Sequence, residues 1–339
     1  MTKAISLRQL GPAVPLFVAI IAFCLLRFGP MDGNSALIAM GVTVDLTILS
    51  PLLYWLIIRK TSIPNITIVP VFIFGTLIAG ILIPSEDQQT LAWIKQWVVP
   101  IVELAALGVI GYHFMVLRKN LKKERTQNTD FFSALKLATA QVFPPKVSDF
   151  LAMELATFYY GFLHWKKPPR YGYTYHKTGG TIAILILFTC LVPVEAVVLH
   201  LLIQQWSDTA AWILTIISLY TALQLFGIIR SIKPRPIEIL QDQLWLKYGI
   251  LAEVKIPMHQ ITSIQRIKGG AAPEGAMTLS PIAAFEGCNV QLTCHEVQTI
   301  RGLYGITKKA KTIAFTVDQV NPFIEEVTRK APGVAESEE

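Results

Sequence analysis

The chain has 339 residues, of which 53% are apolar and only 16% carry a charge. Soluble domains average about 45–50% apolar and about 25% charged residues, so this composition excludes an ordinary water-soluble protein. The net charge of +7 arises entirely within residues 1–232, because residues 233–339 hold 12 basic and 12 acidic residues. A basic excess confined to the apolar part is typical of a membrane protein with short cytoplasmic loops.

Six apolar runs are about long enough to cross a bilayer, which takes roughly 20 residues. They cover residues 10–28, 35–58, 66–83, 97–117, 181–204 and 209–229. Basic residues precede the first run and follow the second, fourth and sixth, whereas the alternate loops are nearly free of them. This pattern predicts about six transmembrane helices with both termini in the cytoplasm. No small-x-small cleavage site follows the first run, so we expect it to stay as a membrane helix.

The stretch between the fourth and fifth runs is expected on the cytoplasmic side. It begins with a charged linker and an amphipathic segment, FFSALKLATAQVF, which ends at two prolines. The following segment, residues 148–165, is apolar almost all round. A seventh span here would move the next basic loop outside, so an interfacial or re-entrant helix is the better interpretation. Three alternating tyrosines in that loop, Tyr171, Tyr173 and Tyr175, are expected at the membrane interface, and the alternative is a lipid-headgroup clamp.

After Pro234 the pattern changes from helical to alternating, and short strands with intervening turn residues are expected, followed by a helix over 320–330. We predict a membrane all-α bundle followed by a small β-rich domain. The predicted segments are 1–117 (four membrane helices), 118–180 (cytoplasmic linker and interfacial helix), 181–232 (two membrane helices), 233–330 (cytosolic domain) and 331–339 (flexible tail).

The progression Leu-Trp-Leu-Lys-Tyr-Gly-Ile-Leu, Ile-Pro and Ile-Thr-Ser-Ile within Ile237–Gln265 resembles the opening strands of bacterial pleckstrin-homology-like (bPH) domains. Residues 289–292, 304–305 and 313–323 take the places of that family's closing strands and helix. The resemblance implies a PH-like fold in a bacterial inner-membrane protein, and a role in binding and assembly. The Gly/Ala/Pro-rich segment 269–287 departs from the family pattern. The six-helix part resembles uncharacterised bacterial membrane proteins in general form.

Polar residues inside apolar runs are the first candidates for function, because ionisable groups in hydrocarbon are costly. Four of them are expected between about 6 and 15 Å from the outer ends of their helices, at about 1.5 Å per residue. These are Asp45, Glu103, Glu195 and His200. We expected Pro193 to break its helix beside Glu195. Glu195 and His200 are weak metal candidates, because five residues place them about 140° apart on a helix. The alternatives are that the layer passes protons, that it lines a substrate pathway, or that each acid only supports packing.

A second set is expected at the inner membrane face, where it would form a pocket for a lipid headgroup or a metal. Its members are His113, Glu154, His164, His176 and Lys177. Three lysines of the cytosolic domain, Lys308, Lys309 and Lys311, are candidates for contact with anionic lipid, worth about 1 kcal/mol each near a charged surface. The alternative for these lysines is a solvated hairpin tip.

The leading hypothesis is an inner-membrane protein that couples a six-helix membrane domain to a PH-like module that binds membrane lipid or a protein partner. The second is a metal-dependent membrane enzyme that acts on an apolar lipid or isoprenoid, with a divalent metal as its cofactor. The third is a small-solute or proton-coupled carrier, which an internal repeat would support, and no clear repeat is found. No catalytic or nucleotide motif is found and no nucleic-acid partner is expected, so the sequence leaves open whether the protein is an enzyme.

Overall fold

The computed structural model describes residues 13–28, 35–61, 63–127, 130–164, 171–177, 180–270 and 272–331. The chain divides into two compact units, Met1–Lys119 and Asn120–Glu339, each of which has its own internal packing. Apart from Ala331, the expected tail lies outside the described residues.

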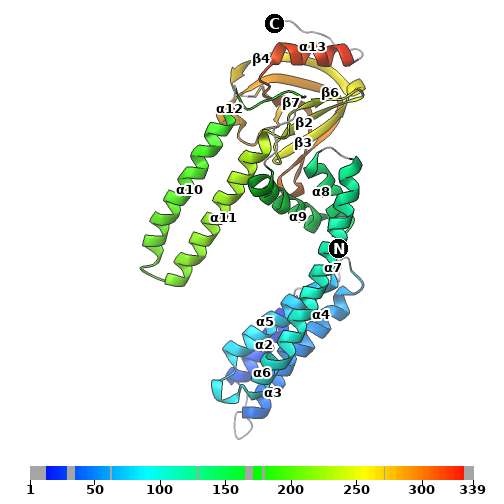
Figure 1. Cartoon of the computed structure of the whole chain (residues 1–339). Coiled ribbons are helices and arrows are strands. Elements are labelled where there is room, and N and C mark those ends of the chain that lie inside the picture. The colour runs from blue at the N-terminus through cyan, green and yellow to red at the C-terminus, as the bar shows by residue number, and fades with distance from the viewer. Residues whose placement is uncertain are drawn as a thin grey trace, which may run out of the picture. The chain divides into compact units, whose positions relative to one another are not determined.

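The first unit is helical (Figure 1). It begins with α2 (Ala13–Phe28), followed by a long helix built from α3 (Ser35–Val44), the π-helical turn η1 (Asp45–Leu49) and α4 (Ser50–Ile58). A shorter one joins η2 (Asn65–Thr67) to α5 (Ile68–Leu82). After η3 (Ser85–Asp87), the last helix runs through α6 (Gln89–Trp93), the π-helical turn η4 (Ile94–Val98) and α7 (Val99–Gln127).

Small residues let α5 approach η1 closely. A Cβ atom at Gly75 would overlap the backbone carbonyl of Leu46, and Ala79 is fully buried. Because neither residue carries a bulky side chain, the two backbones pack directly against each other. This close approach is a packing feature of the first unit.

Five of the described helices are long and apolar enough to cross a membrane, and α2 is apolar but shorter. The five are Ser35–Ile58, Asn65–Leu82, Gln89–Thr126, Thr181–Ile203 and Asp208–Ile232. The third is much longer than the expected run 97–117. Its extension at the C-terminal end holds good helix formers such as Arg, Lys, Leu and Glu without Gly or Pro, so the helix continues through what we predicted as a linker.

In the second unit, α10 (Thr181–Ile203) and α11 (Asp208–Ile232) form a helical hairpin (Figure 1). Ser207 caps α11 by accepting a hydrogen bond from the Ala210 N–H at 3.3 Å. The expected break at Pro193 is wrong, because α10 is a continuous α-helix through that residue. Apolar surroundings and neighbouring turns keep helices intact at proline more readily in membranes than in water.

Two helices, α8 (Phe131–Ala140) and α9 (Pro145–Phe158), follow the first unit, and α9 continues into the π-helical turn η5 (Tyr159–Leu163). They match the amphipathic and apolar segments that the sequence predicted as helical. Asp130 caps α8, since its Oδ2 accepts the Ser133 N–H at 3.0 Å. At the crossing of η5 with α11, a Cβ atom at Gly161 would lie 3.5 Å from the Cα of Gly227, so small residues set this close packing.

The C-terminal part is a mixed seven-stranded sheet with the order β1-β2-β3-β6-β7-β5, and β4 also pairs with β6. All registered pairs are antiparallel except β5 with β7. The elements are β1 (Glu238–Ile239), β2 (Gln243–Tyr248), β3 (Ala252–Pro257), η6 (Met258–Gln260), β4 (Ile261–Gly270), β5 (Met277–Thr278), α12 (Ala283–Glu286), β6 (Cys288–Gly302), η7 (Leu303–Gly305), β7 (Thr307–Phe315) and α13 (Val320–Lys330). The segment 269–287, which departs from the bPH sequence pattern, contains β5 and α12.

One hydrophobic core joins the sheet to the helices of the second unit. It contains Phe323 of α13, Leu246 of β2, Ala156 of α9 and Ile232 at the end of α11. Tyr175 belongs to the same core and its hydroxyl accepts the Gly249 N–H at 2.6 Å, so its expected place at a membrane interface is wrong. Because this core is continuous, the sheet is fixed to the α10–α11 hairpin without a flexible joint.

Candidate functional site

A layer of buried charges lies between α8 and the face of the sheet formed by β2 and β3. Its centre is Arg235, whose side chain is 0% exposed. The guanidinium donates to both oxygens of Asp130, at 2.9 and 2.8 Å, and to Glu253 at 2.6 Å. It also donates to the carbonyl of Gly249 and lies 4.9 Å from the Phe132 ring. A planar donor fork with this set of acceptors is well suited to a buried position.

Two lysines extend this layer. Lys136 of α8 donates to Glu253 at 2.6 Å, and Lys247 of β2 pairs with Glu238 at 2.7 Å. Lys247 also lies 3.8 Å from the centre of the Trp245 ring. Lys136, Lys247 and Glu253 are therefore paired inside the fold, where the pair of Lys136 with Glu253 fixes α8 on the sheet.

The pKa values follow from this pairing. Burial alone would raise the pKa of Glu253, but the charges of Arg235 and Lys136 outweigh it and lower the value to about 2. Burial would likewise raise the pKa of Asp130, and Arg235 instead brings it well below its usual range. Burial lowers the pKa of Lys136, Glu253 opposes that shift, and Arg235 and Arg301 reinforce it. The lowered pKa of Lys136 therefore arises mainly from its burial.

An open groove of about 510 Å³ adjoins the charge layer where β3 and β6 separate. The two strands register at only two pairs, Ala252 with Gly302 and Glu253 with Arg301. Beyond them the strands diverge. The groove is lined by Ser133, Lys136, Leu137, Glu253, Val254, Lys255, Thr299 and Arg301. It thus combines three basic side chains and two hydroxyls with one carboxylate that is already paired twice.

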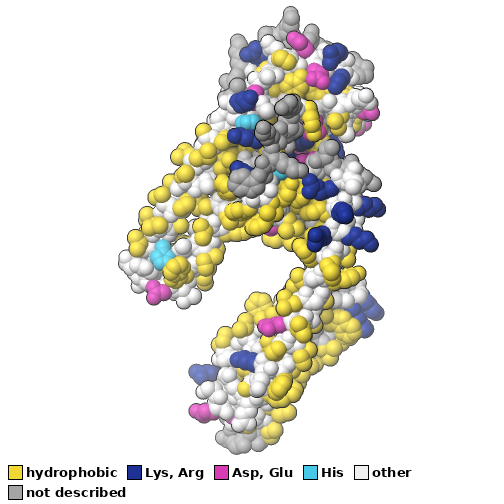
Figure 2. All heavy atoms as spheres, viewed as in Figure 1, with side chains coloured by type: hydrophobic (Ala, Val, Ile, Leu, Met, Phe, Trp, Pro, Cys, Tyr) yellow, Lys and Arg dark blue, Asp and Glu magenta, His cyan; other side chains and the backbone are white. Residues whose placement is uncertain are grey.

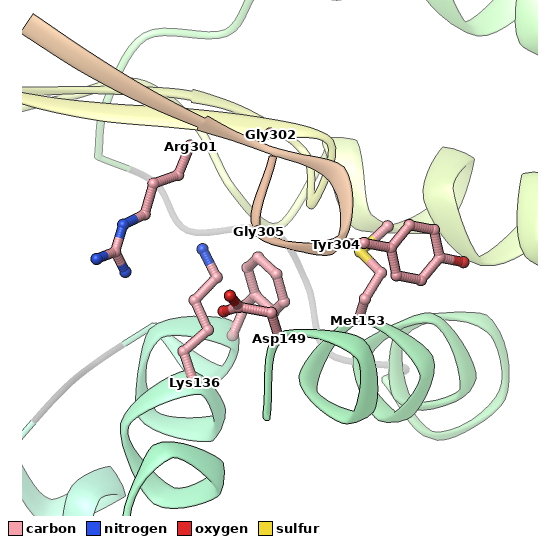
Figure 3. Close-up of a pocket in the computed structure, with 8 residues that line it drawn as sticks. Lys136, Asp149, Met153, Arg301, Gly302, Tyr304 and Gly305 are labelled. Atoms are coloured by element: carbon pink, nitrogen blue, oxygen red, sulfur yellow. The ribbon is translucent and has the colours of Figure 1, made fainter. Parts of the chain in front are cut away.

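At the end of this groove, the tip of the β6–β7 hairpin (η7) docks on α9. Figure 3 shows the Arg301 side chain and the loop at Gly302 and Gly305 facing Lys136 of α8 and Asp149 of α9 across a small cavity, whereas the Tyr304 ring points away from these two side chains. Tyr304 has a positive φ of 51° and its ring stacks on Phe150, with centroids 5.6 Å apart. Gly305 also has a positive φ, and a Cβ atom there would overlap the Asp149 carboxylate. The tip therefore fits closely on α9.

Glu154 lies at the centre of a polar cluster that links the same tip to α11. Its Oε1 accepts hydrogen bonds from Tyr304 at 2.9 Å and from Gln224 at 2.8 Å, and its Oε2 accepts one from Tyr220. Gln224 also donates to the Tyr220 hydroxyl at 2.7 Å. Three elements that are distant in sequence (α9, α11 and η7) are thus joined by one carboxylate.

The other members of the expected inner-face pocket have separate surroundings. His113 of α7 contacts the carbonyl of Val109 at 2.8 Å, within the first unit. His164 lies against the rings of Tyr159 and Tyr160, with both centroid distances 5.5 Å. The Lys177 N–H donates to Asp318 at 2.9 Å. The Nδ1 of His176 is buried without a hydrogen-bond partner among the described residues, and burial lowers the pKa of this histidine.

The outer polar layer divides between the units. Asp45, at the start of η1, and the exposed Glu103 of α7 belong to the first unit, and Glu195 and His200 of α10 to the second. His200 is hydrogen-bonded to Thr215 of α11 at 2.7 Å and lies beside Trp212 in an apolar groove of about 350 Å³. Glu195 is exposed on α10. The convergence of the four residues stays a prediction.

Over the described residues, no group of three or more His, Cys, Asp or Glu side chains is placed to hold a metal ion. The three candidate lysines, Lys308, Lys309 and Lys311, are exposed on β7. Lys308 and Lys309 come shortly after the docked tip in the chain, separated from it by Ile306 and Thr307.

No family model, curated protein or solved structure matches this chain. The PH-like assignment therefore stays a prediction that rests on the strand pattern.

The residues that line the groove were not among the candidates from sequence. The sequence marks Arg235 only as a basic residue that follows the sixth run. It places Glu253 and Lys255 in an expected strand and leaves Arg301 between two expected strands. One signal was present, because Lys247, Glu253 and Lys255 alternate with apolar residues on paired strands. Charges on one face of a strand pair next to a helix that carries Lys136 indicate a polar layer, but only the register brings them together.

Proposed function

We propose that this is an integral membrane protein whose C-terminal β domain lies against the cytoplasmic membrane surface, beside its own spanning hairpin, and binds anionic lipid there. The observation that carries this proposal is the contact of Tyr304, at the tip of the β6–β7 hairpin, with Glu154, which in turn binds Tyr220 of α11.

The position of Tyr220 sets the height of the tip. Tyr220 lies 12 residues before the end of α11 at Ile232, which is about 18 Å along the helix at about 1.5 Å per residue. The whole of α11 has 25 residues and is about 38 Å long, against a hydrocarbon core of about 30 Å. Only about 8 Å of α11 extends beyond the core, so a contact 18 Å from its end supports a tip that reaches the bilayer.

The side chains around the tip suit this position. Exposed apolar residues on α8, on α9 and immediately before β7 are Leu137, Val147, Phe150, Phe158 and Ile306. Figure 2 shows hydrophobic side chains along the α10–α11 hairpin and on the adjoining lower side of the second unit. Lys308 and Lys309 follow Ile306 after one intervening residue, Thr307, and are exposed. An apolar surface bordered by lysines is typical of an element that enters the membrane interface and attracts anionic lipid.

On the opposite side of the sheet, a second contact brings the domain close to α10. The Phe285 ring of α12 lies 6.1 Å from that of Phe188, seven residues into α10. The domain therefore touches both helices of the hairpin alongside their apolar surfaces. Two contacts of this kind hold it at a fixed height, which suits a module that binds at the membrane surface.

Cysteine labelling in vesicles tests this proposal. Cys24 and Cys190 are exposed and are first replaced by alanine, whereas Cys288 and Cys294 are buried. Ile306→Cys and Val297→Cys then place single thiols at positions that are 62% and 58% exposed in the fold. We expect a membrane-impermeant maleimide to label Val297→Cys in inside-out vesicles but not in right-side-out vesicles, and Ile306→Cys to stay unlabelled until detergent is added. Equal labelling of both cysteines in inside-out vesicles would overturn the membrane contact.

A further inference from the structure

The groove between β3 and β6 has the composition of a site for a phosphate-bearing anion. Arg301 and Lys255 are exposed and form no ion pair among the described residues, although Lys255 lies 4.2 Å from the Trp245 ring centre. The third basic residue, Lys136, is held at the groove wall by Glu253. The hydroxyl of Thr299 lines the same groove and is exposed.

The acidic groups that face this groove are already compensated or peripheral. Glu253 accepts from both Lys136 and Arg235, so its charge is balanced inside the fold. Asp149 lies at the small cavity on the side of the tip, away from the groove lining formed by Lys255 and Thr299. Asp130 is bound by Arg235. Arg301 and Lys255, which lack a carboxylate partner among the described residues, are thus available to bind an anion from outside the chain.

The shape of the groove favours a ligand larger than a bare ion. Its volume of about 510 Å³ falls within the range of about 300–1,000 Å³ that is usual for small-molecule sites. Leu137 and Val254 add apolar surface beside the charges. A planar guanidinium such as that of Arg301 binds phosphate oxygens in pairs, and a lysine contributes a point charge.

The height of the groove matches the phosphate layer of a membrane. Arg301 precedes Tyr304 by three residues, so the two backbones lie at most about 10 Å apart, which is the reach of three extended residues. With the tip contact about 10 Å inside the edge of the hydrocarbon, Arg301 lies close to the level of the lipid headgroups.

We propose that the groove lined by Lys136, Lys255, Thr299 and Arg301 binds the phosphate of a phospholipid headgroup or of a free phosphorylated small molecule. This inference rests on the proposed function only for the phospholipid headgroup. A free phosphorylated molecule reaches the groove from the cytosol whether or not the domain touches the membrane.

Calorimetric titration of the full-length protein in detergent tests the site with two probes. They are inorganic phosphate and dihexanoyl phosphatidic acid below its micellar concentration. The test variant is the double change Arg301→Gln and Lys255→Gln, which leaves the buried charge layer intact. The control is Arg266→Gln with Arg329→Gln, which removes the same charge from exposed positions of β4 and α13 outside the groove lining. We expect at least a tenfold loss of affinity in the test variant and less than a twofold change in the control.

Each outcome decides the question. If both probes bind to the groove with similar affinity, the site takes free phosphorylated molecules; if only the lipid binds, it takes headgroups. The proposal is overturned if neither probe binds the wild type, or if test and control variants lose affinity equally. The labelling of Ile306→Cys is measured separately, so membrane contact of the tip can hold while the phosphate site fails.

Discussion

Replacing Arg235 by methionine removes the charge at the centre of the buried layer and leaves its carboxylate partners in place. Asp130 then loses both of its guanidinium hydrogen bonds, and Glu253 keeps only Lys136. Removal of one partner from a buried ion pair costs about 3–5 kcal/mol, because the other charge stays buried and uncompensated. At about 1.4 kcal/mol for each factor of ten, the loss corresponds to roughly a hundred- to a few-thousand-fold in the opening equilibrium.

Hydrogen exchange of the full-length protein in detergent measures this loss at the amides of β2 and β3, whose exchange reports the opening of the sheet. Arg329→Met is the matched control, since Arg329 is exposed on α13 and its replacement is expected to cost less than about 0.5 kcal/mol. Adding Asp130→Leu to Arg235→Met removes the uncompensated carboxylate, so the double variant should lose less than the sum of the two single changes. Exchange in Arg235→Met that matches the Arg329→Met control would refute the buried-charge account.

Three further perturbations address the pH response and the close packing of α9. The folded-state pKa of Glu253 is about 2, below its usual value, so its contribution to stability is present above about pH 4.5 and is lost as the pH falls toward 2. In an acid titration followed by tryptophan fluorescence, the stability of Glu253→Gln should therefore depend less on pH than that of the wild type. Gly305→Ala forces a side chain into a positive-φ position against Asp149 and should destabilise the tip by about 1–3 kcal/mol, seen as faster exchange at 303–306, and unchanged exchange would contradict the docking. The valine of Gly227→Val would overlap the backbone of Thr157, so this variant should lower the melting temperature by several degrees. The control Gly108→Val should not, because nothing lies within 4 Å of a Cβ atom there. Equal melting temperatures of the two variants would exclude the α9–α11 contact.

Local patterns in the sequence predicted the elements of this fold well. The apolar runs, the helix over 320–330 and the alternating strands each follow from a periodicity that needs no tertiary information. Helix ends were less predictable, because the run 97–117 continues as a helix through charged residues that are good helix formers. Pro193 is the clearest error, since its cost depends on surroundings that a single sequence does not display.

The site depends on information that the sequence does not carry locally. Glu154 was chosen as a polar residue in an apolar segment, but its partners Tyr220, Gln224 and Tyr304 lie 66, 70 and 150 residues away. Arg235 looked like an ordinary basic residue after a span, and only the packing of α8 on the sheet buries it. Long-range register thus decides which charges meet.

The most direct test of the account is the depth of the hairpin tip in a bilayer. A bimane fluorophore on Ile306→Cys, in nanodiscs of phosphatidylglycerol with lipids brominated at known acyl positions, reports that depth through quenching. We predict that bromines near the headgroup end of the acyl chains strongly quench the fluorophore on Ile306→Cys and do not quench it on Val297→Cys. Val297 is similarly exposed in the fold, but it lies in the segment of β6 between the two stretches that pair with β7. Absence of quenching at Ile306→Cys, with the fold intact by hydrogen exchange, would contradict the claim that the β domain lies on the membrane surface.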